Sequence, residues 1–131
     1  MEKYIDELQL QKDVHLMGFV DDPFSYVKRA DVFVLSSLWE GFGNVVAESL
    51  ALGTQVVSTN CPSGPSEILG NGDYGRLVPI GNTEALSEEM LKAVKHPMDR
   101  SKLVSRSKDF LVDKIAIEYL DFLLNKGKDI T

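Results

Sequence analysis

Residues 31–48 read DVFVLSSLWEGFGNVVAE, and this stretch determines the fold that we expect. It begins with an apolar run, 32–36, that is too short for a helix and rich in residues that favour strands. Both faces of the run are apolar, which suits a buried strand of a parallel sheet. Glycines follow at Gly41 and Gly43, and a helical pattern starts at Asn44. The stretch therefore predicts a strand, a tight turn and a helix in succession.

The same alternation of short apolar runs and helical patterns continues on both sides of this stretch. It predicts an α/β fold with an open, Rossmann-like parallel sheet, right-handed crossovers and flanking helices. Gly53 and Pro97 are typical helix stop signals. The further strands are expected at 14–19, 55–59 and 76–78, and the helices at 44–52, 65–69 and 83–95.

Both ends of the chain also carry helical patterns. Residues 1–11 read as the back end of an amphipathic helix, which suggests a piece of a larger protein. The run Asp21-Asp22-Pro23 is typical of a helix start. Residues from about 101 to 126 are expected to form one long helix whose apolar positions cover more than one stripe. We expect residues 1–131 to form a single, partial domain.

Composition narrows the classes of function and of cellular location. The net charge of −6 argues against a nucleic-acid-binding surface. Cys61 is the only cysteine, so no internal disulfide is expected, as in a reducing compartment. No apolar run is long enough to span a membrane, and no signal peptide is recognisable, so we expect a cytoplasmic protein. His15 and His96 lack partners at ligand spacing, and no metal site is expected.

The residues of the turn indicate a site for a phosphorylated sugar. Ligands of open parallel sheets bind beyond the carboxyl ends of the strands. The turn Gly41–Asn44 leads into a helix N-terminus, where free amide groups and the helix dipole favour a phosphate. Glu40 before the turn and Glu48 one helical turn later could each accept hydrogen bonds from a diol. Together they match a nucleotide-sugar, although alone the turn is a weak signal and Glu48 could merely stabilise the dipole.

The spacing of these two glutamates resembles the E-x7-E motif of retaining glycosyltransferases with the GT-B fold, most closely family 4 (group 1). Several neighbouring segments are similar to that family and follow in the expected order. The resemblance extends over about residues 14–94 and is carried by 14–20, 31–37, 51–59, 63–68 and 75–79.

The resemblance implies a role for each residue of the motif. Glu40 would be the catalytic residue that contacts hydroxyl groups of the transferred hexose, and Glu48 would bind the ribose. The nucleotide-sugar donor would be of UDP or GDP type, with no cofactor and no metal. The remaining implied contacts are Gly41, Phe42 and Gly43 with sugar and phosphate, Asn44 and Val45 with the diphosphate, and Phe19 and Val20 with the base.

The chain also departs from the family pattern. The N-terminal domain that would receive a glycan or lipid-linked acceptor is missing, as are two strands and the basic residues that accompany them. Arg29 and Arg76 are the nearest substitutes, although ordinary surface charge is the favoured interpretation. We therefore expect the isolated chain to be inactive. Its open sheet edge should either pair 14–19 with 32–36 or form a homodimer.

Several alternatives remain at this point. The chain could be a non-catalytic nucleotide-binding module, or an interaction module that completes a partner chain. The full-length enzyme could be membrane-associated. Ser63–Glu67 could close one wall of the nucleotide site, or Glu67 could only cap a short helix. Trp39 could stack on a sugar, although packing beneath the turn is favoured.

Overall fold

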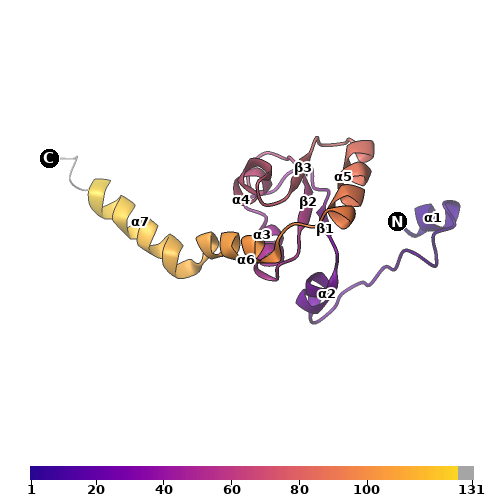
Figure 1. The fold of residues 1–131 in the computed structure, drawn as a ribbon, viewed down its shortest axis with the longest axis horizontal. Helices are drawn as coiled ribbons and strands as arrows, with labels where there is room; N and C mark the ends of the chain where they lie inside the picture. The colour runs from indigo at the N-terminus through magenta and orange to yellow at the C-terminus, as the bar shows by residue number, and fades with distance from the viewer. Residues whose placement is uncertain (127–131) are drawn as a thin grey trace.

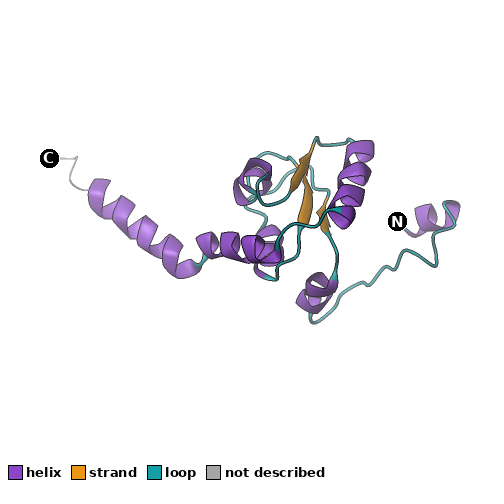
Figure 2. Ribbon diagram, viewed as in Figure 1, coloured by secondary structure: helices purple, strands orange, loops and turns teal. Residues whose placement is uncertain are grey.

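The computed structural model describes residues 1–126 and contains a three-stranded parallel sheet with the order β1-β2-β3. The strands are β1 (Phe33–Leu35), β2 (Val56–Thr59) and β3 (Arg76–Val78). The helices are α1 (Glu2–Glu7), α2 (Pro23–Arg29), α3 (Asn44–Ala51), α4 (Pro65–Ile68), α5 (Thr83–Lys95), α6 (Arg100–Ser107) and α7 (Val112–Lys126), with 3-10 turns η1 (Gly70–Gly72) and η2 (Lys108–Phe110). Figures 1 and 2 show these elements around the sheet.

The strand β2 is buried on both sides because helices cover both faces of the sheet. Val56 belongs to a core cluster with Leu50 of α3 and Leu103 of α6. Val57, the next residue, points to the opposite face and joins a second cluster with Ala93 of α5. The expected α/β class with an open parallel sheet is confirmed, and β3 and α5 have the bounds that the sequence predicts.

Gln55 directly precedes β2, at the N-terminal end of the parallel strands, where it joins three segments. Its side chain is only 7% exposed. Its Nε2 donates to the carbonyl oxygens of Asp31 at 2.9 Å and Ala93 at 3.0 Å. Its Oε1 accepts a bond from the Met98 amide at 3.3 Å. The sequence assigned Gln55 to a strand without a polar role, and the structure adds that role.

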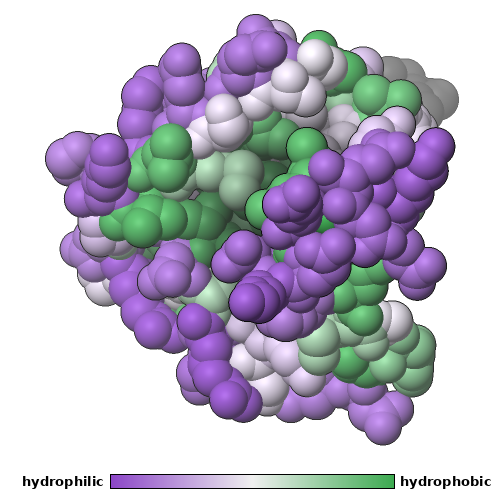
Figure 3. Space-filling view, turned by 90° about the vertical axis from the view of Figure 1, so that its right-hand side faces the viewer, coloured by the Kyte–Doolittle hydropathy of each residue, from purple (hydrophilic) through white to green (hydrophobic). Residues whose placement is uncertain are grey.

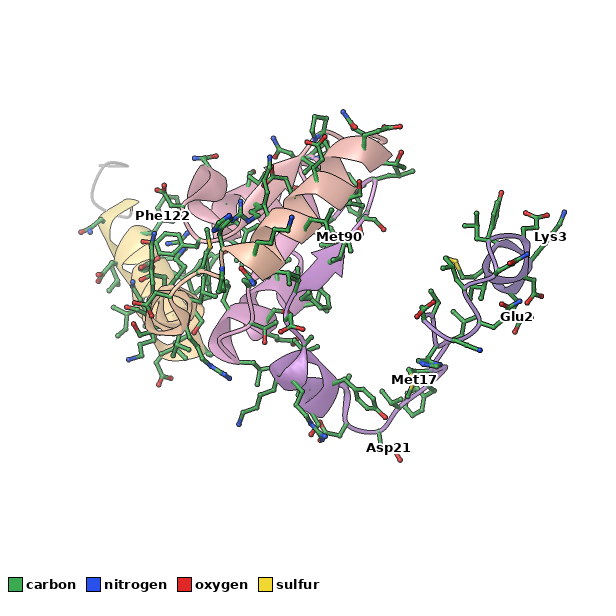
Figure 4. All side chains as sticks on the ribbon, turned by 45° about the vertical axis from the view of Figure 1, so that its right-hand side comes forward. Glu2, Lys3, Met17, Asp21, Met90 and Phe122 are labelled. Carbon is green, nitrogen blue, oxygen red and sulfur yellow. The ribbon has the colours of Figure 1, made fainter. Side chains whose placement is uncertain are left out.

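The segment 14–19 is not a strand, so this prediction is wrong. It belongs to an extended connection between α1 and α2 that lies apart from the sheet. Figure 4 labels Met17 and Asp21 on this connection. A strand needs a neighbour for its backbone N–H and C=O groups, and in residues 1–126 the only ladder partner of β1 is β2. Pairing of 14–19 with 32–36 is therefore also wrong. Phe19 is 93% exposed. Figure 3 views the molecule from the side on which the N-terminus lies and shows apolar patches among the hydrophilic surface.

The C-terminal tail is not one continuous helix, so the prediction of a single long helix over about residues 101–126 is wrong. Leu111 has an extended backbone (φ −65°, ψ 138°) that separates η2 from α7 and lets α7 project from the body (Figure 1). Phe110 packs against the core, whereas Val112 is 82% exposed. The break therefore separates a part of the tail that packs on the core from α7, where Ile117 and Leu120 remain 60% and 57% exposed.

Hydrogen bonds at helix ends favour the charged form of several carboxyl groups. Asp22 and Asp99 cap α2 and α6, and their hydrogen bonds from Ser25 and Ser101 lower the pKa of each carboxyl. Beside the break, Asp109 bonds Lys114 and Arg106, and these two cations lower its pKa as well.

We expect the melting temperature to be constant above about pH 5 and to fall below about pH 4, where these carboxylates become protonated. A carboxyl group whose pKa is lower in the folded than in the unfolded protein stabilises the fold when the pH is above the unfolded pKa. That stabilisation is lost as the pH falls through the folded-state pKa. Circular dichroism melts between pH 7 and pH 2.5 measure this. Asp99→Asn, which retains a capping oxygen, should flatten the dependence, and a flat wild-type curve down to pH 3 would contradict the prediction.

Candidate functional site

The segment that we call the 40–44 turn (Glu40–Asn44) lies between the carboxyl end of β1 and the start of α3. Gly43 is the N-cap residue of α3 and has a left-handed backbone (φ 82°, ψ 54°), which glycine adopts without a steric penalty. The first N–H groups of a helix have no acceptor within it, so the eight-residue α3 presents them toward this turn. Because α3 is fixed by buried Val46 and Leu50, the turn stands on a rigid base.

Glu40 is half-buried, and the hydroxyl groups of two serines donate hydrogen bonds to it. Ser37 Oγ donates to Glu40 Oε1 at 2.6 Å, and Thr59 Oγ1 at the end of β2 donates to the Ser37 carbonyl at 2.5 Å. Ser63 Oγ donates to the Glu40 carbonyl oxygen at 2.9 Å. Ser37 therefore links Glu40 to the carboxyl ends of both β1 and β2, where the sequence predicts a site beyond a parallel sheet.

Gly64 packs directly against the backbone of the 40–44 turn. Its backbone has φ 77° and ψ −86°, and a Cβ built there would overlap the carbonyl oxygen of Phe42. Only a glycine fits at this position without displacing the turn. Ser63 and Gly64 thus form a bracket around Glu40 and Phe42.

The other predicted site residues lie on α3, beside the 40–44 turn, or in the extended segment before α2. Asn44 and Val45 start α3 and are exposed beside the turn. Glu48 is also exposed, and it lines a cavity of about 160 Å³ together with Pro23 and Phe24 of α2. Phe19 lies in the extended segment, apart from the sheet, and Val20 follows it there.

The structure shows the surroundings of three neighbouring residues that the sequence singled out. Trp39 does not pack beneath the turn, because it is 70% exposed. Arg76 Nη1 forms an ion pair with Glu89 Oε2 of α5 at 3.0 Å. The guanidinium group of Arg76 therefore lies on the α5 face of the sheet. Glu67 lines a cavity of about 590 Å³ beside Phe42, together with Phe110, Val112, Ile115, Ala116 and Tyr119.

Sequence reasoning missed several residues that support the turn. The Phe42 and Phe110 rings lie 5.6 Å apart in an edge-to-face arrangement, although 68 positions separate them (110 − 42). No local pattern signals such a contact. Ser37, in contrast, lies three residues before Glu40, and that short spacing is a signal that could have revealed their bond.

No group of three His, Cys, Asp or Glu side chains within residues 1–126 is arranged to hold a metal ion. Over the same range, no helix combines the length and the apolar character needed to cross a membrane.

The fold and the turn place the chain in the class of α/β domains that bind ligands at the carboxyl ends of parallel strands. The chain belongs to a particular family of that class, the group 1 glycosyl transferases, whose sequence model matches residues 1–110.

The chain is 35% identical over 124 residues to the N-acetylgalactosamine-N,N'-diacetylbacillosaminyl-diphospho-undecaprenol 4-alpha-N-acetylgalactosaminyltransferase of Campylobacter jejuni. This match spans 92% of the chain and 34% of the relative, so the chain corresponds to about a third of that protein's length.

Two solved structures resemble the fold. The lipopolysaccharide outer core galactosyltransferase WaaB superposes with a TM-score of 0.84 at 19% identity, covering 95% of this chain and 37% of that one. Anabaena HepE, solved in complex with UDP, has a TM-score of 0.74 at 19% identity and covers 99% of this chain and 36% of its own. These likenesses confirm the expected glycosyltransferase fold.

Proposed function

We propose that the chain is the nucleotide-sugar donor-binding part of a retaining glycosyltransferase that transfers a hexose to a glycan or glycolipid acceptor. The observation that carries this proposal is the bracketed 40–44 turn, with Glu40 fixed at the carboxyl ends of β1 and β2 and the start of α3 beside it. UDP in the structure of HepE supports a nucleotide diphosphate as part of the donor. The diphospho-undecaprenol named for the Campylobacter relative supports a lipid-linked acceptor.

Each group of the site has a distinct part in this proposal. Glu40, held in one rotamer by Ser37, accepts hydrogen bonds from hydroxyl groups of the sugar. The amides that begin α3, at Asn44 and Val45, face the diphosphate and stabilise the negative charge that builds up as it leaves. Glu48 accepts bonds from the ribose hydroxyls. The protein supplies no metal and no cofactor in this mechanism, and the donor is of UDP or GDP type.

The base side of the site requires a rearrangement. Phe19 is almost fully exposed, whereas a base-binding residue must lie next to the nucleotide. In the proposed site, the extended segment folds toward the carboxyl edge of the sheet, so that Phe19 and Val20 line the base. We also propose that the chain alone binds the donor but does not transfer the sugar, because the acceptor-binding part lies outside it.

Glu48→Ala is expected to weaken nucleoside diphosphate binding about 10- to 100-fold, since a hydrogen bond to a charged group contributes about 1.5–3 kcal/mol. Titration calorimetry with UDP, GDP and ADP measures the affinity. Glu88→Ala, an exposed glutamate of α5 on the other face of the sheet, is the matched control and should leave binding unchanged. Unchanged affinity in Glu48→Ala would remove the ribose role. If the wild-type chain bound none of the three nucleotides at millimolar concentration, the proposed function itself would be wrong.

A further inference from the structure

The 40–44 turn contacts the C-terminal part of the chain as well as the sheet. Leu103 of α6 is 1% exposed and packs with Val46 and Leu50 of α3. The helix α6 therefore lies against the helix that the turn begins, and it ends in η2, which carries Phe110.

Arg106 is fixed by hydrogen bonds on all sides of its guanidinium group. Nε donates to the Ile68 carbonyl at 3.0 Å and Nη2 donates to the Glu67 carbonyl at 2.7 Å. These carbonyls belong to the end of α4, where acceptors have no helical donor and the dipole favours a cation. Nη1 donates to Asp109 at 2.9 Å. Arg106 thus connects α6 to α4, which directly follows the Ser63–Gly64 bracket.

The same guanidinium group forms a platform for Phe110. Its central carbon lies 4.7 Å from the centroid of the Phe110 ring and 5.2 Å from that of Tyr74. Cations at these distances are attracted to the faces of aromatic rings. Phe110 is therefore held by Arg106, and its own edge-to-face contact is with Phe42.

Phe42 is the only apolar side chain of the 40–44 turn, and it lies between two glycines. Gly41 and Gly43 leave the backbone free to adopt many conformations, so a contact that fixes the Phe42 ring removes much of that freedom. Glu48, in contrast, lies on α3, whose position is set by the core residues Val46 and Leu50.

We propose that Arg106 and Phe110 are positioning residues, which hold the 40–44 turn through Phe42 in the conformation that receives the outer phosphate and the sugar of the donor. This inference rests on the proposed function. It makes the α6–η2 segment part of the donor site, although neither residue touches the nucleotide. It also separates the ligand into two parts: the nucleoside monophosphate, bound through Glu48 and the first amides of α3, is independent of Phe110, and the outer phosphate and the sugar depend on it.

The test compares nucleoside diphosphate with nucleoside monophosphate. Calorimetry with UDP and UMP, or with GDP and GMP, gives the increase in affinity that the second phosphate contributes. Phe110→Ala is expected to reduce that increase about tenfold and to leave monophosphate binding unchanged. Phe110→Tyr retains the ring and should restore wild-type values. Arg106→Lys, which keeps the charge but loses the planar guanidinium group over the Phe110 ring, should resemble Phe110→Ala. Leu111→Ala, an exposed neighbour outside the contact, is the control.

A second readout needs no ligand. Trp39 is the only tryptophan and lies next to Glu40, so its fluorescence anisotropy reports the mobility of the turn. We expect a lower anisotropy in Phe110→Ala, with an unchanged far-ultraviolet circular dichroism spectrum. Equal loss of diphosphate and monophosphate affinity, or no change in either affinity or anisotropy, would overturn the inference. Absence of nucleotide binding by the wild-type chain would instead overturn the proposed function, and the anisotropy would still decide whether Phe110 holds the turn.

Discussion

Gly64→Ala is expected to lower the free energy of unfolding by about 2–4 kcal/mol, from backbone strain together with overpacking. Gly64 has a positive φ of 77°, which costs alanine energy at any site. In addition, its new Cβ would overlap the Phe42 carbonyl oxygen, and backbone atoms cannot rotate away as a flexible side chain can. Either the 40–44 turn or the Ser63–Gly64 bracket must therefore move.

Gly81→Ala separates these two causes. Gly81 has a similar φ of 74°, but a Cβ there would have no heavy atom within 4 Å. Urea unfolding should show a loss of only about 1 kcal/mol for Gly81→Ala, because strain acts alone. Equal losses in the two variants would show that the Phe42 contact is unimportant. Binding gives a further distinction: Gly64→Ala should weaken nucleoside diphosphate binding, whereas Gly81→Ala should not.

The part of the site that the sequence predicts is the part that local chemistry determines. The strand 33–35, the glycine turn and the helix from Asn44 are contiguous, and each has its own signal in residue type. Asp22 and Pro23 likewise predict the start of α2, where Asp22 caps the helix and Pro23 is its first residue. Such features need no knowledge of distant segments.

The predictions that were wrong depend on distant partners. Residues 14–19 have the composition of a strand, but a strand exists only where another lies beside it. The tail has an uninterrupted helical pattern, yet it breaks at Leu111. Phe110 there packs toward Phe42, and Asp109 is bonded from both sides of the break. Periodicity along one segment contains no information about these contacts, which form only when the chain is folded.

Gln55 is a further case, because its importance lies in three backbone groups from other segments. The carbonyl of Ala93 would normally accept from the amide four residues later, but residue 97 is a proline and has no N–H. Gln55 supplies the donor instead, and it also satisfies the carbonyl of Asp31 and the amide of Met98. One buried side chain therefore joins the entry to β1, the end of α5 and the segment that leads to α6.

Gln55→Leu keeps a side chain of similar size and is expected to lower the free energy of unfolding by about 2–4 kcal/mol, because it leaves the buried Ala93 carbonyl and two partly buried backbone groups without their partner. Urea unfolding followed by circular dichroism measures the change. Gln11→Leu is the matched control: Gln11 is exposed and its bond to Asp6, at 2.9 Å, lies in solvent, so the loss should stay within about 0.5 kcal/mol. A Gln55→Leu chain as stable as wild type would mean that apolar packing replaces the lost bonds. Since Gln55 lies at the end of the sheet opposite Glu40, stable variants should retain nucleotide binding, which distinguishes a role in the fold from a role in the site.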